Sequence, residues 1–163
     1  MNRQRMRGVY VVEFAIVGLL LFIVLFGALE MGRLLFTVNT LNESVRRGAR
    51  LAVVCNIQDP VILRKAVFAG TNSTVSSLIG NLDTTDLVLR YFDQSGAEIA
   101  DPSPSGGFSQ IRFVQVSIEK FPFHLMIPVW GSDILLQPFR AVLPRESLGR
   151  HAEKGVVPEI TPC

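Results

Sequence analysis

The sequence predicts an α+β protein in which one long N-terminal helix carries a small C-terminal head with a short antiparallel sheet. Three observations lead to this class. Residues 9–29 are apolar apart from a single glutamate, Glu13. An apolar helical stripe then continues to residue 54, and the first proline is Pro60. Beyond it, short runs of β-branched and aromatic residues alternate with turn residues, as is typical of strands.

The apolar segment Val9–Leu29 has the length of a membrane-spanning helix, which needs about 20 residues. A cleaved secretory signal has an apolar core of only about 7–15 residues and an A-x-A-like site after it. The sequence that follows here, GALEMGRLL, contains no convincing site of this kind. The segment is therefore expected to remain in the protein as an anchor.

The basic residues in front of the anchor predict its orientation. Arg3, Arg5 and Arg7 precede it, whereas Arg33 is the only basic residue in the stretch just after it. Lys and Arg near a membrane-spanning segment favour the cytoplasmic side. The N-terminus is therefore expected in the cytoplasm, and the head on the far side of a bacterial inner membrane, in the periplasm.

The helix is expected to continue past the membrane as an amphipathic shaft. Apolar residues recur at steps of three and four and so form one face of a helix; they are Leu34, Val38, Leu41, Val45, Ala49 and Ala52. The prediction is a single helix over residues 9–54, about 70 Å long. Its protruding half needs a partner for its apolar stripe, which the head can supply.

The head is expected over residues 55–146. Asp59 and Pro60 are typical of a helix start, so a second helix is predicted over 60–80. Three segments are predicted strands, the last with Pro138 at an edge or bulge: Leu87–Phe92, Ile111–Ile118 and Ile134–Leu143.

Two further segments are predicted to lack regular structure. Phe121–Trp130 is apolar but contains Pro122 and Pro128, and we expect a loop folded over the core. Residues 147–163 form a polar tail that is expected to be poorly ordered.

The two cysteines are Cys55 and Cys163. A periplasmic head is in an oxidising compartment, where disulfides persist. Spacing alone cannot show that two Cα atoms are close. An intramolecular bridge, two free thiols and a bond to another subunit all remain open at this stage.

The charge and the motifs exclude several classes of function. The chain has 16 basic and 14 acidic residues, and removing the three leading arginines leaves a net charge of −1, which argues against nucleic acid as a partner. His124 and His151 have no metal-ligand spacing with the cysteines. No nucleophile, phosphate-binding or cofactor motif occurs. We therefore expect neither an enzyme nor a cofactor or metal site.

The most informative pattern is at the N-terminus. Basic residues precede Gly8, four residues follow, and then come Glu13 and Phe14. A charged residue at the bilayer centre costs roughly 2.5–3.5 kcal/mol, so an intramembrane acid is a candidate functional residue. This order is the processing signature of a prepilin, which is cut after the glycine and keeps its apolar segment.

These residues resemble the TadE-like proteins of tight-adherence (Flp-type) pilus systems. The resemblance lies in RGVYVVEFAIVGLLLFIVLFGALEMGRLLF and in the later RRGARLAVV, and it is strong over residues 7–54. It implies a pilin-like fold and a minor pilin or pseudopilin of the type IVb class. The first eight residues would then be a leader.

The resemblance also implies roles for four residues. Gly8 would precede the cut, and Val9 would be the first mature residue. Glu13 and Phe14 would serve subunit register and assembly, with Glu13 paired to the new amino group of a neighbour. The implied partners are a prepilin peptidase, other pilins or pseudopilins, an inner-membrane assembly platform with its ATPase, and membrane lipid.

Two departures from the family pattern shape the expected role. A tyrosine usually follows the glutamate in the major pilin, where this chain has Phe14, and this chain is much longer than a major subunit. Both favour a minor role in assembly or initiation, inside the pilus or at its base. The alternatives are a single-pass, signal-anchored protein with a periplasmic binding or sensor head and, more distantly, an anchored periplasmic enzyme.

Overall fold

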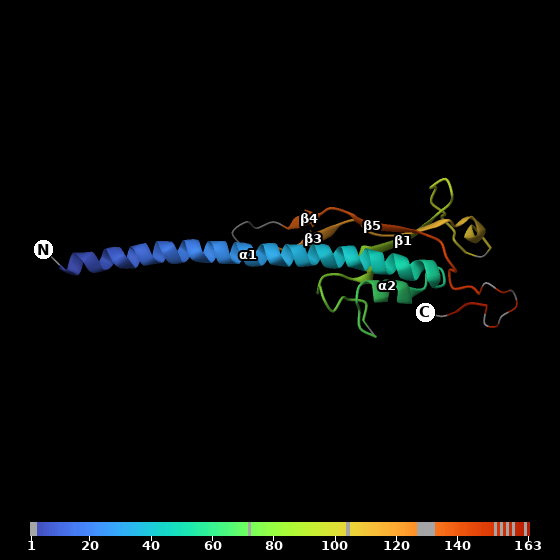
Figure 1. Cartoon of the computed structure of the whole chain (residues 1–163), viewed down its shortest axis with the longest axis horizontal. Coiled ribbons are helices and arrows are strands. Elements are labelled where there is room, and N and C mark those ends of the chain that lie inside the picture. Colours follow the sequence, from blue (N-terminus) through green and yellow to red (C-terminus); the bar gives the residue numbers. More distant parts are fainter. Residues whose placement is uncertain are drawn as a thin grey trace. The chain divides into compact units, whose positions relative to one another are not determined.

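The computed structural model describes residues 3–71, 73–103, 105–126 and 133–151, together with 153, 155, 157, 159–161 and 163, with side chains from residue 8 onward. The chain divides into two compact units. Unit 1 comprises Met1–Phe36 and Phe123–Ile134, and unit 2 comprises Thr37–Pro122 and Leu135–Cys163. Figure 1 shows a long helix with short strands and one short helix, so the α+β class is confirmed. The sequence-based limits at residues 8, 54 and 146 stay predictions.

Helix α1, Arg3–Val54, accounts for 52 residues. It is uninterrupted because no proline lies within it and its four internal glycines after Gly8 are widely spaced. The predicted single helix is confirmed, although it begins several residues before Val9. Its last turns, in unit 2, bury Leu41, Val45 and other members of the expected stripe.

Helix α2, Pro60–Ala66, is much shorter than the predicted helix over 60–80. Its start is as expected: Pro60 is in the first turn, and the Asp59 carboxylate accepts a hydrogen bond from Val61 N at 2.9 Å. It ends at Ala66 because the chain turns at Phe68, whose φ is +58°, outside the helical region. Turns and the short 3₁₀ helix η1, Thr84–Asp86, follow.

The main sheet is antiparallel with strand order β1-β2-β5. Strand β1 is Leu87–Phe92, as predicted; β2 is Phe113–Ile118, two residues shorter than predicted; and β5 is Phe139–Pro144. A second 3₁₀ helix, η2, Phe108–Gln110, precedes β2.

One face of this sheet packs on α1 and forms the core of unit 2. The register aligns Leu87, Ile118 and Phe139 across the three strands, and all three side chains are buried. Gly48 marks the closest approach. A Cβ there would lie 3.1 Å from both Ala66 Cβ of α2 and Val116 Cγ1 of β2. A side chain at this position would separate α1 from the elements on either side of it.

The segment between β2 and β5 differs from the prediction. Phe121–Phe123 forms strand β3, where a loop is predicted, and it pairs with β4, Ile134–Leu136. Residues 124–126 of the predicted loop belong to no helix or strand, and its remainder, residues 127–130 with Trp130, lies outside the described residues. Pro122 is compatible with β3 because this strand belongs to a two-stranded sheet and needs only one hydrogen-bonded edge.

The predicted strand Ile134–Leu143 is in fact two strands in two sheets, β4 and β5. The break falls at Gln137 and Pro138. A proline has no N–H to donate to a ladder, and it restricts the residue before it, so pairing stops there.

The prediction of a poorly ordered tail is wrong for residues 147–151. Leu148 is fully buried, and its N–H donates to Val53 O at 3.0 Å. Gly149 N donates to Val54 O at 2.7 Å. The tail thus supplies donors to carbonyls at the end of α1, which have no partner within the helix.

Candidate functional site

The four residues of the N-terminal pattern lie on the first turns of α1. Gly8, Val9, Glu13 and Phe14 are all exposed in unit 1, and Phe14 has 79% of its surface accessible. Apart from the adjacent residues and the neighbouring backbone of α1 itself, no described atom lies within 4 Å of where a Cβ of Gly8 would be. The Gly8–Val9 peptide bond is therefore unobstructed by the described part of the chain, although it is wound into the helix.

Helical geometry relates these residues to one another. Val9 and Glu13 are four residues apart and so lie on the same face, about 6 Å apart along the axis. The Glu13 carboxylate has no hydrogen-bond or ion-pair partner among the described residues. As far as the described residues go, this acid is available to a partner from outside.

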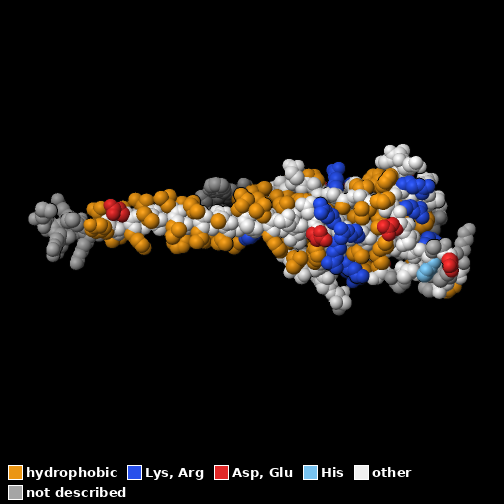
Figure 2. Space-filling model, viewed as in Figure 1, with side chains coloured by type: hydrophobic (Ala, Val, Ile, Leu, Met, Phe, Trp, Pro, Cys, Tyr) orange, Lys and Arg blue, Asp and Glu red, His pale blue; other side chains and the backbone are white. Residues whose placement is uncertain are grey.

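The surface around Glu13 is apolar. In unit 1, most large apolar side chains of α1 between Val9 and Leu29 are more than half exposed. Figure 2 shows this part of α1 covered by hydrophobic side chains on the face in view. Among the described residues, Gly8–Val54 is the one helix long and apolar enough to cross a membrane. An exposed apolar surface of this extent is typical of sites that contact lipid or another protein.

A charged cluster immediately after the apolar stretch was not predicted from the sequence. Arg33 Nη1 lies 2.7 Å from Glu30 Oε1, and the Arg33 guanidinium lies over the Phe123 ring at 5.1 Å. All three residues belong to unit 1. The three-residue spacing of Glu30 and Arg33 is the signal that could have indicated an ion pair. Nothing in the sequence indicated that a segment 90 positions later would join it.

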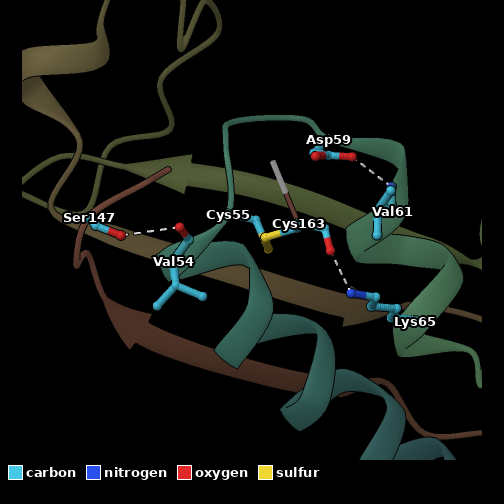
Figure 3. The surroundings of a disulfide bond; sticks show 7 residues. All are labelled: Val54, Cys55, Asp59, Val61, Lys65, Ser147 and Cys163. Atoms are coloured by element: carbon cyan, nitrogen blue, oxygen red, sulfur yellow. Dashed lines mark hydrogen bonds between the residues drawn. A yellow bond between two sulfur atoms is a disulfide. The ribbon is translucent and has the colours of Figure 1, made fainter. Parts of the chain in front are cut away.

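At the end of α1, in unit 2, a disulfide and two hydrogen bonds attach the C-terminal tail (Figure 3). Cys55 and Cys163 are bonded, with Cα atoms 5.6 Å apart, which is one of the three arrangements that spacing left open. Lys65 Nζ donates to Cys163 O at 2.7 Å, and Ser147 Oγ donates to Val54 O at 3.1 Å. The tail is thus attached to both α1 and α2.

The arginines on the exposed face of α1 in unit 2 are not part of an ion-pair network. Arg46, Arg47 and Arg50 are exposed, and the Arg47 guanidinium lies over the Phe68 ring at 4.9 Å. None of them lies within ion-pair distance of a described carboxylate. They form a solvated basic face.

A second arginine group braces η2. Arg145 Nη1 donates to the carbonyls of Phe108 and Ile111, and the guanidinium groups of Arg145 and Arg150 both lie over the Phe108 ring. Burial lowers the pKa of Arg145, with a smaller contribution from the charge of Arg112. These contacts hold η2, just before β2, in place. The two carbonyl oxygens and the Phe108 ring also stabilise the positive charge of the partly buried Arg145.

The described residues lack the spacing of ligand side chains that a metal site requires. They contain no group of three or more His, Cys, Asp or Glu side chains that could hold a metal ion. The structure brings His124 near Asp133, with Nδ1 2.5 Å from Oδ1, and both side chains are more than half exposed. Both residues belong to unit 1.

Comparison with known proteins identifies a family for the N-terminal part. The family model described as TadE-like protein matches residues 8–50, so the resemblance inferred from the sequence is confirmed there. The match begins at Gly8 and includes Val9, Glu13 and Phe14. Neither the curated proteins nor the solved structures contain a match to the chain. The TadE-like family is associated with the tight-adherence pilus, and this chain is similar to it over α1.

Proposed function

We propose that this protein is a membrane-anchored minor pilin, or pseudopilin, that helps assemble or initiate a tight-adherence pilus. The observation that carries the proposal is the family match over residues 8–50, which begins at the glycine of the processing signature and includes Glu13. The exposed apolar surface of α1 supports an anchoring role. The arginines before Gly8 support a cytoplasmic N-terminus and a periplasmic head.

Cleavage after Gly8 requires a local change in α1. The Gly8–Val9 bond is helical in the uncleaved chain, whereas a peptidase cleft accepts an extended strand. Glycine lowers the free energy needed to unwind this turn, because it weakens a helix by roughly 0.8–1.0 kcal/mol relative to alanine and adopts extended geometry readily. A bulky residue at position 8 would both stabilise the helix and obstruct the cleft.

Glu13 would set the axial register between neighbouring helices after cleavage. The cut leaves Val9 with a free amino group, a cation close to the level of Glu13. In a bundle, the carboxylate of one subunit can pair with the amine of the next, which neutralises both charges within the apolar layer. Apolar packing fixes such an offset poorly, because lipid is as apolar as the helix surface. The polar pair therefore gives register, and the aliphatic surface gives contact area.

The mature N-terminus tests the processing step. Intact-mass and peptide mass spectrometry of the protein from its native membrane should find Val9 as the first residue, and Gly8→Leu should remain uncut. A protein that begins at Met1 in cells with an active prepilin peptidase would contradict the proposal. It would favour the alternative of a signal-anchored binding or sensor protein.

A matched pair of variants tests the register role. Glu13→Ala should insert and be processed normally but should lose most of its co-purification with other pilus subunits. Val12→Ala, at the neighbouring exposed position, is the control and should behave as wild type. Equal recovery of subunits with both variants would exclude Glu13 from register.

A further inference from the structure

We propose that residues 123–126 of unit 1 form a second membrane contact, which lies in the lipid interface beside the Leu29 end of the spanning stretch. The segment is called the interfacial arm below. This inference rests on the proposed anchoring by α1 and adds a lipid-contacting element that is separate from it in sequence. It is argued only from the described residues of unit 1.

The interfacial arm is attached to α1 by three contacts. The Phe123 ring lies under the Arg33 guanidinium, 5.1 Å from its carbon to the ring centroid. Arg33 Nη2 donates to His124 O at 3.5 Å, and Met126 N donates to Glu30 Oε2 at 3.4 Å. Each end of the arm is thus held by one partner of the Glu30–Arg33 ion pair.

The arm contacts a charge that follows the apolar stretch directly. Only 13% of the Glu30 side chain is exposed, against 41% for Arg33. A carboxylate this well covered needs hydrogen-bond donors, and Arg33 Nη1 and Met126 N provide them. The contacts are therefore part of how Glu30 is accommodated, so the arm is held in place by more than incidental packing.

The position of Glu30 and Arg33 along the helix places them at the lipid–water boundary. The 21 residues Val9–Leu29, all but Glu13 uncharged, rise about 31 Å as a helix, which matches a hydrocarbon layer about 30 Å thick. Glu30 and Arg33 follow within one turn and so fall among the headgroups. Arginine and aromatic side chains are favoured at this level. A segment fixed to these two residues lies at the same level.

The arm and its surroundings present apolar side chains there. Met126 is 71% exposed, Met31 on α1 is 56% exposed, and Ile134 is 41% exposed. An apolar group held at the headgroup level is desolvated by the upper acyl chains. Because the arm is attached to Glu30 and Arg33, which follow the spanning stretch directly, we assign lipid as the occupant of this surface. The interfacial arm would then act as an interfacial anchor that restricts the tilt and rotation of α1.

Depth-dependent fluorescence quenching tests the contact. The only tryptophan of the chain is Trp130, so Trp130→Phe gives a background without tryptophan. Three reporters are then placed singly in the full chain: Met126→Trp in the arm, Leu19→Trp in the spanning stretch and Val142→Trp on the exposed side of β5. Each protein is reconstituted into phosphatidylcholine vesicles that carry bromine either near the headgroup or near the bilayer centre.

The expected result separates the two proposals. Met126→Trp should lose about half of its emission with the shallow bromine and little with the deep one, as an interfacial group does. Leu19→Trp should show the opposite preference, and Val142→Trp should be quenched by neither. If Met126→Trp behaves like Val142→Trp while Leu19→Trp is quenched at depth, the interfacial arm is refuted and the anchor stands. If Leu19→Trp is not quenched, the anchor itself fails.

Two further measurements test the attachment and the occupant. Arg33→Gln removes the ion pair and the contact with Phe123, and it should reduce the shallow quenching of Met126→Trp. The matched control Arg50→Gln, at an exposed arginine of the same helix, should not. Quenching that falls as the protein-to-lipid ratio rises would assign Met126 to contacts between copies of the chain and would overturn the lipid contact.

Discussion

Replacing Cys163 with serine is expected to remove a large part of the stability of unit 2. The bond to Cys55 closes a loop with a sequence separation of 108 residues, and it joins the end of α1 to the tail. Cys163 is exposed, so the serine itself should fit without strain. The main effect is therefore on the unfolded chain, which gains the freedom that the bond had removed.

The size of the effect follows from the loop. In the chain-entropy description, closing a loop of 108 residues stabilises the native state by about 4.8 kcal/mol at 25 °C. Residual structure in the unfolded chain lowers this figure, so we expect a loss of about 3–5 kcal/mol. For a unit of this size, such a loss lowers Tm by about 10–20 °C.

The assay is thermal unfolding of the full chain in a mild detergent, followed by near-ultraviolet circular dichroism, in which the loss of packing around aromatic side chains such as the buried Tyr91 of unit 2 is followed. The control is wild-type protein treated with a reductant, which should match Cys163→Ser. A Tm change below about 3 °C, or an equal further loss when the variant is treated with reductant, would refute the reasoning.

Two other predictions concern the tail and a turn. Gly149 has a φ of +74°, and a Cβ there would lie 2.7 Å from Asn56 N, so Gly149→Ala should destabilise unit 2 by about 2–4 kcal/mol in the same melt. Gly155→Ala, which has a φ of +85° but open space around it, should cost only the backbone strain, and equal losses would contradict the close contact. The pKa of Asp93 is lowered, first by the hydrogen bond from the Ser95 side chain and then by that from Ala97 N. A lowered pKa means that the charged carboxylate stabilises the turn above its unfolded pKa of 3.8, and that this is lost as the pH falls through the folded value. Amide exchange at Ala97, corrected for intrinsic rates, should therefore accelerate on acidification below pH 3.8 in wild type but not in Asp93→Asn, and an unchanged protection factor would count against it.

Patterns of neighbouring residues in the sequence were enough to predict α1, β1 and the start of α2. The apolar period and the absence of proline were sufficient for α1, and alternation of β-branched and aromatic residues was sufficient for β1. The Asp59 cap was likewise readable from two adjacent residues. In each case, neighbours in sequence determine the structure, and no distant contact overrides them.

The mispredicted elements depend on distant partners. Phe121–Phe123 becomes a strand because β4 lies beside it, and no feature of that segment alone indicates a partner 13 residues later. Leu148 and Gly149 become ordered because the carbonyls of Val53 and Val54 need donors. The residues of the candidate site were found through the processing signature. The cluster of Glu30, Arg33 and Phe123 could not be predicted in this way, because Phe123 is far from the other two residues in the sequence.

The donors that complete the end of α1 have a consequence for how the protein is made. Ser147 follows Val54 by 93 residues. The ribosome must therefore translate all the strands in between before Ser147 can donate its hydrogen bond to Val54 O at the end of α1. Unit 2 cannot reach its final form while the nascent chain is still short. For the periplasmic head proposed above, this order keeps unit 2 incompletely folded until its last residues have been made, and an incompletely folded chain is the form that a translocation channel accepts. It also means that prematurely terminated products would expose an unfinished terminus to quality-control proteases.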